Sequence, residues 1–582
     1  MRHLFILASL VALTLSNQAH SQCAGSIPLL CDANGDFFVD ADDIAAIGAA
    51  KGSLSTGTAD IRDIDGDGTI TVLDARQCTA HCSLPECSDG TWTTYYVDCE
   101  AAAAGDGTLS APWNNLESAN SVLLGPGDRI RLRRGTVCNG MLQPQGAGTA
   151  GRRILIGAYG EGALPRIDGQ GLVSAAVHLD DVSHLVLKDL ELTNPGDPSE
   201  PRRGVFLTST ERKVSNIEIR DLFIHHVSGP VGFNGTAKRG GGIIADSRFR
   251  TTDTQIDGVL IENNRIEDVG RSGIYFDGSS ASTSDRPRAW EDWPAAGQNV
   301  VIRGNTLKRL QGDAIVAHGT AGAVIEDNVV SVGNLAGRDW TSPDRNCAAG
   351  IWTWNSINTL IQRNEVSGYR FGQSATDGCD GTGFDIDNEQ EGTIIQYNYS
   401  YNNEGGFILL CSDDEPHTAH VRYNLSIDDG KVLNVSPCKF PTVGTFDDIK
   451  VYNNTFVTAR PLTALETIPQ SVISNAGDFL FANNIVYATS EQSEPLACGD
   501  YCTNNLFYNI TPSGTDFVVG DPLFVDVGWR GLGRLDAGAA FRIRQGSPAF
   551  AAGLGLVMPA PREDYFGNQV PANPAIGMHQ LE

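Results

Sequence analysis

A short pattern recurs along most of this chain and limits what it can fold into. Each repeat is a segment of alternating apolar and polar residues that breaks at an asparagine and then resumes, as in IDGVLIENNRIEDV (256–269) and EGTIIQYNYSYN (391–402). Such alternation is typical of β-strands. Repeats about 20–40 residues apart are typical of solenoids, in which each coil covers the core of the last. The recurring asparagines are Asn264, Asn305, Asn328, Asn364, Asn398, Asn424, Asn454 and Asn484.

Asparagine suits the turns of such a solenoid. It tolerates the left-handed backbone conformation, and stacked asparagine side chains can hydrogen-bond from one coil to the next. A β-sandwich with asparagine turns is the alternative. Irregular insertions between steady strand patterns favour stacked coils, so we predict an all-β chain built as a parallel β-helix.

A second short strand follows many of the asparagine turns, and these strands can be aligned. Side chains at i and i+2 share a face, so the third and fifth positions face the same way, while the second and fourth, which are mostly apolar, face the core. The third and fifth positions are rich in Asp, His, Trp and Tyr, which cannot be interior without partners. We therefore predict that they form the floor of an external groove. The series is GVFLT (204–208), GIIAD (242–246), GIYFD (273–277), AIVAH (314–318), GIWTW (350–354), GFDID (383–387) and GFILL (406–410).

Asp385 and Asp387 form the centre of the predicted site. Two residues along a strand place these like charges about 6.5–7 Å apart. Their repulsion should raise the pKa of one carboxyl and make the pair titrate as a unit. One protonated and one ionised carboxyl is what glycosidic hydrolysis requires. Structural calcium is the alternative for this pair. Asp277 and His318 are predicted to form a second acid/base pair, one coil apart.

Aromatic and charged residues near the pair predict sugar binding. Tryptophan and tyrosine rings can stack on sugars, although core packing is the alternative. Arginines in the loops 282–294 and 336–348 would suit a sugar that bears sulfate or carboxylate. The predicted substrate-binding residues are Trp352, Trp354, Tyr275, Asp246, Trp290, Arg288, Arg345 and Asp380.

Several segments resemble known β-helix proteins. The stretch that begins WTTYYVDCE (92–100) resembles the entry of a secreted right-handed β-helix, and GDPLFVD (520–526) and PAIGMHQLE (574–582) resemble closing turns of the pectate-lyase-like superfamily. The segments around 347–368 and 381–411 resemble bacterial β-helix proteins that include glycoside hydrolases acting on fucose- or xylose-containing glycans. The resemblance implies a right-handed parallel β-helix catalytic domain over 91–582. It makes Asp385 and Asp387 the matching acidic positions and adds Glu404 as a catalytic candidate.

The N-terminus has the features of an export signal. Arg2 and His3 precede a short apolar core, LFILASLVALTL (4–15), and Ala19-x-Ser21 is a small-residue cleavage pattern. No lipobox precedes Cys23. We therefore expect a signal peptide over 1–21 and a secreted or extracellular protein.

Residues 22–90 contain two acidic loops with calcium-ligand spacing, DANGDFFVDADD (32–43) and DIDGDGTITVLD (63–74). They resemble a type I dockerin, a small α-helical EF-hand-like module, although Phe37 replaces the usual turn glycine. The resemblance implies Ca²⁺ binding and a cohesin-like or cell-surface protein partner. A calcium-stabilised spacer and an acidic linker are the alternatives. The predicted ligands are Asp32, Asn34, Asp36, Asp40, Asp43, Asp63, Asp65, Asp67, Thr71 and Asp74.

Composition excludes some partners. A formal net charge of −28 argues against nucleic acid. We find no stretch long and apolar enough to span a membrane. Thirteen cysteines fit an oxidising compartment, although zinc is an alternative for CTAHCSLPEC (78–87).

These features predict a secreted polysaccharide-degrading enzyme, most simply a glycoside hydrolase. A polysaccharide lyase or epimerase on uronate-containing glycans is the second hypothesis. It needs a base that is often Lys or Arg, which Lys238, Arg239 or a loop arginine would have to supply. A non-catalytic glycan-binding surface protein is the third.

Overall fold

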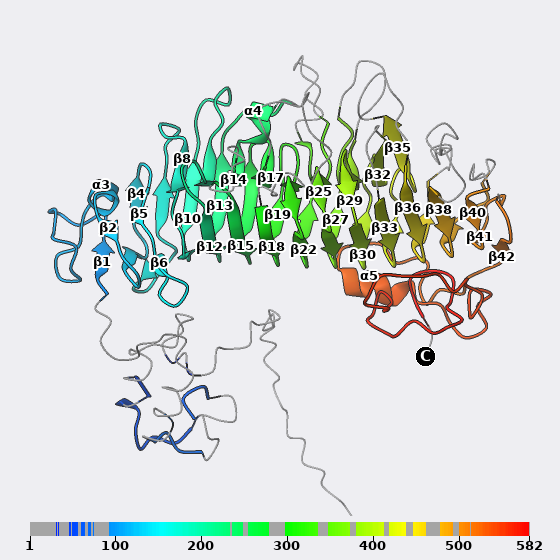
Figure 1. Ribbon diagram of the computed structural model, residues 1–582, viewed down its shortest axis with the longest axis horizontal. Helices are drawn as coiled ribbons and strands as arrows, with labels where there is room; N and C mark the ends of the chain where they lie inside the picture. Colours follow the sequence, from blue (N-terminus) through cyan, green and yellow to red (C-terminus); the bar gives the residue numbers. More distant parts are fainter. Residues whose placement is uncertain are drawn as a thin grey trace, which may run out of the picture. The chain divides into compact units, whose positions relative to one another are not determined.

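The structure is a computed structural model of the 582-residue chain (Figure 1). It divides into two compact units, Met1–Thr91 and Trp92–Glu582, and each is described by itself. The structure describes residues 31, 33, 46–47, 49–55, 60–63, 68–71, 74, 92–232, 235–247, 254–278, 297–335, 347–372, 380–412, 418–437, 446–460, 478–492, 500–512 and 514–580.

Three long parallel sheets build the second unit. Sheet 1 has 17 described strands and runs from β1 (Thr94–Val97) to β40 (Cys502–Thr503), and sheet 2 has 14, from β4 (Val137–Asn139) to β42 (Val518–Val519). Sheet 3 has nine. A typical coil contributes strands to the three sheets in turn, as β15 (Ile256–Glu262), β16 (Arg265–Val269) and β17 (Ser272–Asp277) do, and each of these strands pairs in parallel with its counterpart in the next coil. Figure 1 shows these strands side by side along the unit. The predicted parallel β-helix is therefore confirmed.

Sheet 3 carries the column of strands that the sequence aligned. The predicted register holds for every pair from Val205–Ile243 to Trp352–Asp385. The nine strands are β8 (Ala175–Asp180), β11 (Arg203–Thr208), β14 (Gly241–Asp246), β17, β20 (Ile315–His318), β24 (Ile351–Trp354), β28 (Thr382–Ile386), β32 (Gly406–Ser412) and β35 (Asn434–Pro437).

The last aligned strand was placed one residue out of register. Asp385 pairs with Leu409, not with Ile408, and Ile386 pairs with Leu410. Ile408 and Leu410 face the main core instead. Residues 407–411 are all apolar, so no alternation of polar and apolar residues shows which of them face the core. The strand was therefore aligned by the glycine before it alone. The correction brings Cys411 to the outer face beside the predicted site.

The core lies between the three sheets. The second and fourth positions of the aligned strands, such as Ile274 and Phe276, belong to one continuous apolar cluster with almost no exposed surface. The third positions form a separate cluster on the outer face of sheet 3, which contains Ile244, Tyr275 and Trp352. The alternation predicted from sequence therefore separates the inner and outer faces of this sheet.

The asparagines form a continuous ladder at the turn between sheets 1 and 2. In each coil the backbone and side-chain N–H groups of one asparagine donate to the side-chain oxygen of the next, at 2.9–3.1 Å from Asn264 through Asn505. The ladder asparagines are buried. The ladder was predicted up to Asn484, and Asn505 extends it.

The left-handed residue of each turn is not the ladder asparagine. Positive φ falls on the residue before it, for example Asn263 (φ 55°) before Asn264 and Arg363 (φ 55°) before Asn364. The prediction that asparagine is selected for left-handed backbone was therefore wrong at these positions. The side chain satisfies buried backbone groups of two neighbouring coils instead.

The C-terminal segment does not form closing turns in the stack. Residues from about 520 onward, with α5 (Arg534–Ala540), lie along the outer face of sheet 2 (Figure 1). Phe524, Phe541 and Tyr565 pack there against tyrosines such as Tyr399. The Glu365 carboxylate accepts hydrogen bonds from the amides of Gly533 and Arg534, which fixes the start of α5. The prediction of closing turns is corrected accordingly.

The described part of the first unit is a small paired structure. Leu54 and Thr69 form an antiparallel bridge, and Ile47, Ile70 and Cys31 form a minimal core. In the second unit, α3 (Leu116–Asn120) covers the first coils, and a disulfide joins Cys99 to Cys138.

Candidate active site

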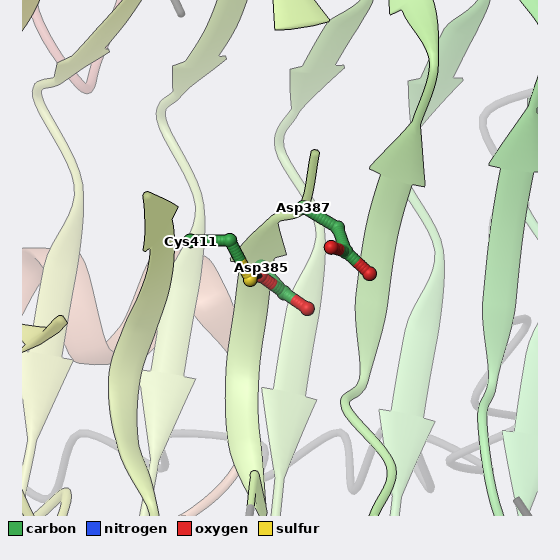
Figure 2. A group of neighbouring side chains, drawn as sticks. All are labelled: Asp385, Asp387 and Cys411. Carbon is green, nitrogen blue, oxygen red and sulfur yellow. Dashed lines mark hydrogen bonds between the residues drawn. The ribbon is translucent and has the colours of Figure 1, made fainter. Parts of the chain in front are cut away.

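The predicted acidic pair lies at the end of β28. Asp385 is in the strand, and Asp387 follows it (Figure 2). One oxygen of each carboxyl lies within 4.8 Å of the other and of the Cys411 sulfur. The gap between these oxygens is thus smaller than the 6.5–7 Å expected from strand spacing, because both side chains point to the same side.

Asp385 is enclosed, whereas Asp387 is half-buried. Burial raises the pKa of Asp385 well above its usual range, and the charges of Asp387 and Asp380 add to the effect. The Asp385 oxygen lies 3.9 Å from the Cys411 sulfur. Cys411 is disulfide-bonded, so this sulfur carries no proton and cannot donate to the carboxyl. The enclosed environment of Asp385 therefore favours its neutral, protonated form.

Asp380 belongs electrostatically to the same cluster. Burial, together with the charges of Asp313 and Asp387, raises the pKa of Asp380 to about 7, against the opposing effect of Arg271 and Lys238. A half-buried carboxyl with this pKa can exchange its proton near neutral pH. We had assigned Asp380 to substrate binding, but this environment suits a proton donor.

Three charged residues at the cluster were not among the predicted site residues. Asp313 accepts hydrogen bonds from the indole N–H of Trp352 (3.2 Å) and from the fully buried Arg271 (2.9 Å). The Lys238 ammonium lies 4.4 Å from the centre of the Trp352 ring. Arg271 and Asp313 each precede an apolar strand, a position that usually faces solvent, so no sequence signal indicates that they are buried. Lys238 had been considered only for a lyase.

Trp352 pairs with Asp385 in the sheet but does not offer its ring face to a ligand. It is 3% exposed, its N–H binds Asp313, and Lys238 covers the ring. The core-packing alternative describes Trp352 better than sugar stacking. Trp354 is half-buried and stacks on His318 at 4.4 Å.

The other predicted acid/base pair lies in an enclosed network. Asp277 and His318 have no exposed surface, and the His318 ring nitrogen lies 3.4 Å from an Asp277 oxygen. Arg239 pairs with Asp277 and approaches Asp246 at 3.9 Å. The Tyr275 hydroxyl lies 3.4 Å from His318, and burial raises the pKa of Tyr275. Asp246 and Tyr275 are also buried. This arrangement holds adjacent coils together and presents none of the four predicted site residues to a substrate.

The remaining candidates are engaged by other partners or lie outside the described residues. Glu404 pairs with Arg370 at 2.9 Å and accepts the amide of Phe371 at 3.0 Å. These contacts fix a turn and leave Glu404 less suited to proton transfer than Asp380. Arg288, Trp290 and Arg345 lie outside the described residues.

Of the two predicted metal sites, the one in the groove is fully described and the one in the dockerin-like loops is not. Within the described ranges, Asp385, Asp387 and Cys411 are the group with metal-ligand spacing, but a disulfide sulfur is a poor ligand and calcium needs six to eight oxygens. Of the dockerin-like ligands, Asp63, Thr71 and Asp74 are described. Among the described residues, one buried Asp63 oxygen has no hydrogen-bond partner, which fits a cation ligand. Asp74 accepts from the backbone and hydroxyl of Thr71. Asp32, Asn34, Asp36, Asp40, Asp43, Asp65 and Asp67 lie outside the described residues.

Comparison with known proteins identifies the class of fold. The family model "Right handed beta helix region" matches residues 168–366 and 254–456. The chain is a right-handed parallel β-helix protein, as the sequence predicted.

Its relatives include carbohydrate-active enzymes. The chain is 28% identical over 449 residues to a lacto-N-biosidase of Bifidobacterium longum subsp. longum, a match that covers 62% of this chain and 27% of the relative. The chain thus spans about a quarter of that relative's length. A GH136 lacto-N-biosidase structure from Eubacterium ramulus is 24% identical, with a TM-score of 0.55 over 78% of this chain and 79% of the other. XylC, solved with xylose, is 16% identical, with a TM-score of 0.51 over 84% and 98% of the two chains.

Among the described helices, none is long and apolar enough to cross a membrane.

Proposed function

We propose that this chain is a glycoside hydrolase that uses the carboxylates at the end of β28. The observation that carries the proposal is the cluster itself, in which Asp380, with a pKa of about 7, lies close enough to Asp387 for their charges to interact. Hydrolysis of a glycosidic bond requires one carboxyl that gives a proton and one that acts as a base or nucleophile. The 28% identity to a lacto-N-biosidase supports the same class of reaction.

We assign the proton-donor role to Asp380. Its pKa allows it to be protonated in the ground state and to lose the proton to the leaving oxygen near neutral pH. Asp387 is the more exposed member of the adjacent pair and supplies the carboxylate that attacks directly or activates water. Asp385 is enclosed and lies next to Asp387, whose position it supports. The division of labour follows from the different environments of three neighbouring carboxyls.

The substrate we propose is a polysaccharide or a complex glycan. The relatives direct attention to lacto-N-biose-containing and xylose-containing glycans, and the sequence resemblance adds fucose-containing ones. The acidic cluster disfavours sulfate or uronate at the cleavage point, because like charges repel when they are desolvated. Anionic sugars are still included among the substrates to be tested, because the loop arginines lie outside the described residues.

The test is a substrate panel with two simultaneous readouts. The full chain, with calcium, is incubated with neutral, uronic and sulfated glycans, while new reducing ends and the ultraviolet absorbance of unsaturated sugars are followed. Reducing ends without absorbance are expected. Asp380→Asn and Asp387→Asn should abolish them, whereas Asp448→Asn, a half-buried carboxylate on sheet 1, should not. Absorbance that rises with the reducing ends would establish a lyase, and binding without product would establish a glycan-binding protein.

The first unit completes the proposal. We propose that residues 1–21 direct export and that residues 22–90 bind Ca²⁺ through the two acidic loops and dock to a cohesin-like or cell-surface protein. The spacing of the loops and the unpartnered buried oxygen of Asp63 support this. Pull-down with cohesin domains, with and without calcium, tests it. Binding lost on chelation is expected, and binding unaffected by chelation would contradict it.

A further inference from the structure

We infer that the buried ion pair Arg271–Asp313 positions Asp380, through the segment 347–349, for its role as proton donor. This inference deepens the proposed function and rests on the assignment of Asp380 as proton donor. Arg271 stands before β17, three strands away from β28 in sheet 3, and Asp313 stands before β20, two strands away. Neither residue has a role in sugar contact, since both side chains are at most 1% exposed.

The pair anchors the segment that enters β24. Arg271 donates to Asp313 at 2.9 Å and to the carbonyl of Cys347. Asp313 in turn accepts the backbone N–H of Ala349 at 3.3 Å and the indole N–H of Trp352 at 3.2 Å. Both ends of the segment 347–349 are therefore bound to one buried ion pair.

This segment holds the backbone of Asp380. The carbonyl of Ala348 accepts the N–H of Gly381 at 2.9 Å, and the carbonyl of Gly381 accepts the N–H of Gly405 at 2.9 Å. Asp380 and Gly381 both have left-handed backbone (φ 49° and 69°). A Cβ on Gly381 would lie 2.7 Å from the carbonyl oxygen of Arg370, so the turn packs closely against the backbone of Arg370. A displacement of 347–349 would therefore move Asp380.

The same pair contributes to the charge around Asp380. Asp313 favours the protonated carboxyl, and Arg271 opposes it. Because hydrogen bonds fix the ion pair in place, the fold sets the balance of positive and negative charge around Asp380. The charged residues that bear on Asp380 or its turn are Asp313, Arg271, Lys238, Asp385, Asp387 and the Arg370–Glu404 pair.

The experiment compares Asp313→Asn and Arg271→Lys with wild type in the full chain. Asp313→Asn removes a negative charge and leaves Arg271 unbalanced, so the alkaline limb of the pH profile of kcat/KM should move to lower pH by about one unit. Arg271→Lys keeps the charge but loses the forked contact with Cys347 and Asp313. It should lower kcat by about tenfold or more with a smaller change in KM, because misplacement of a catalytic group has a cost of this order.

Matched variants separate positioning from stability. Arg422 is also fully buried and donates to Gln396 and to the carbonyl of Pro559, and Asp564 is a buried carboxylate of the C-terminal segment. Arg422→Lys and Asp564→Asn should lower the melting temperature without moving the pH profile. A folded Asp313→Asn protein with the wild-type profile would overturn the inference.

A second readout does not depend on activity. The carboxyl of Asp380 can be titrated by infrared spectroscopy as the difference between each protein and its Asp380→Asn counterpart. The midpoint should fall when Asp313→Asn is introduced. An unchanged midpoint would overturn the inference even if no substrate is cleaved. A lowered midpoint in a chain that cleaves no glycan would uphold the pair's effect on Asp380 and overturn only the proposed hydrolysis.

Discussion

Replacing one asparagine of the ladder should destabilise the β-helix far more than replacing an ordinary polar residue of a turn. Asn364 is fully buried, and its side chain takes part in four hydrogen bonds. It donates to the side-chain oxygen of Asn398 (3.0 Å) and to the carbonyl of Ile325 (2.9 Å). Its oxygen accepts the backbone and side-chain N–H groups of Asn328, both at 3.0 Å.

Asn364→Ala would leave two buried N–H donors of Asn328 without partners. Each orphaned buried donor costs about 1–3 kcal/mol, so we expect a loss of about 2–6 kcal/mol in the free energy of unfolding. Asn139→Ala is the matched control. Asn139 is exposed at the end of β4 and makes no side-chain hydrogen bond with the other described residues, so its replacement should cost no more than about 0.5 kcal/mol.

The assay is urea unfolding followed by circular dichroism, together with hydrogen exchange of the peptide that contains Asn328. Exchange reports the local opening even if the long solenoid does not unfold in one step. Asn364→Ala should accelerate exchange around Asn328 and lower the urea midpoint. Equal midpoints and equal exchange for the two variants would refute the claim that the ladder stabilises the stack.

Three further results are expected. Asp380 has a pKa of about 7 in the folded chain and about 3.9 in the unfolded chain, so its contribution to stability is fully present below pH 4 and is lost as pH rises towards 7. Over this pH window the melting temperature of wild type should therefore fall more steeply than that of Asp380→Asn. Parallel curves for the two proteins would contradict this prediction. Calorimetric titration should find two Ca²⁺ ions per chain, with one lost in Asp63→Ala, and no heat in either protein would refute the calcium loops. Glu365→Ala should expose the segment after Gly533 to proteolysis, while Glu391→Ala, at an exposed position of sheet 1, should not. Equal cleavage of the two variants would show that Glu365 does not fasten α5.

The sequence was sufficient for the fold because each coil repeats the same physical requirement. Apolar alternation identified the strands, and the ladder asparagines were found from their spacing alone. The register failed only at 406–410, where glycine was used as a marker. The glycine at 383 is there because a Cβ would meet the side chain of Ser400 at 2.6 Å, a local crowding that the next coil does not repeat.

The site was less predictable because burial decides the role of a carboxyl. Asp385, Asp387, Asp277 and Asp380 look alike in the sequence, yet Asp277 is enclosed by an arginine and a histidine, whereas Asp380 is half-buried among like charges. Asp313 and Arg271 could not be found at all, since their contacts join coils 42 residues apart.

The most direct test of the central claim is cleavage of a glycan in water enriched in oxygen-18, followed by mass spectrometry of the products. Hydrolysis inserts one solvent oxygen for each bond broken, whereas a lyase inserts none. The account predicts one heavy oxygen in the products of wild type and no product from Asp380→Asn or Asp387→Asn. Products without the label, or labelled products at wild-type rate from Asp387→Asn, would contradict it.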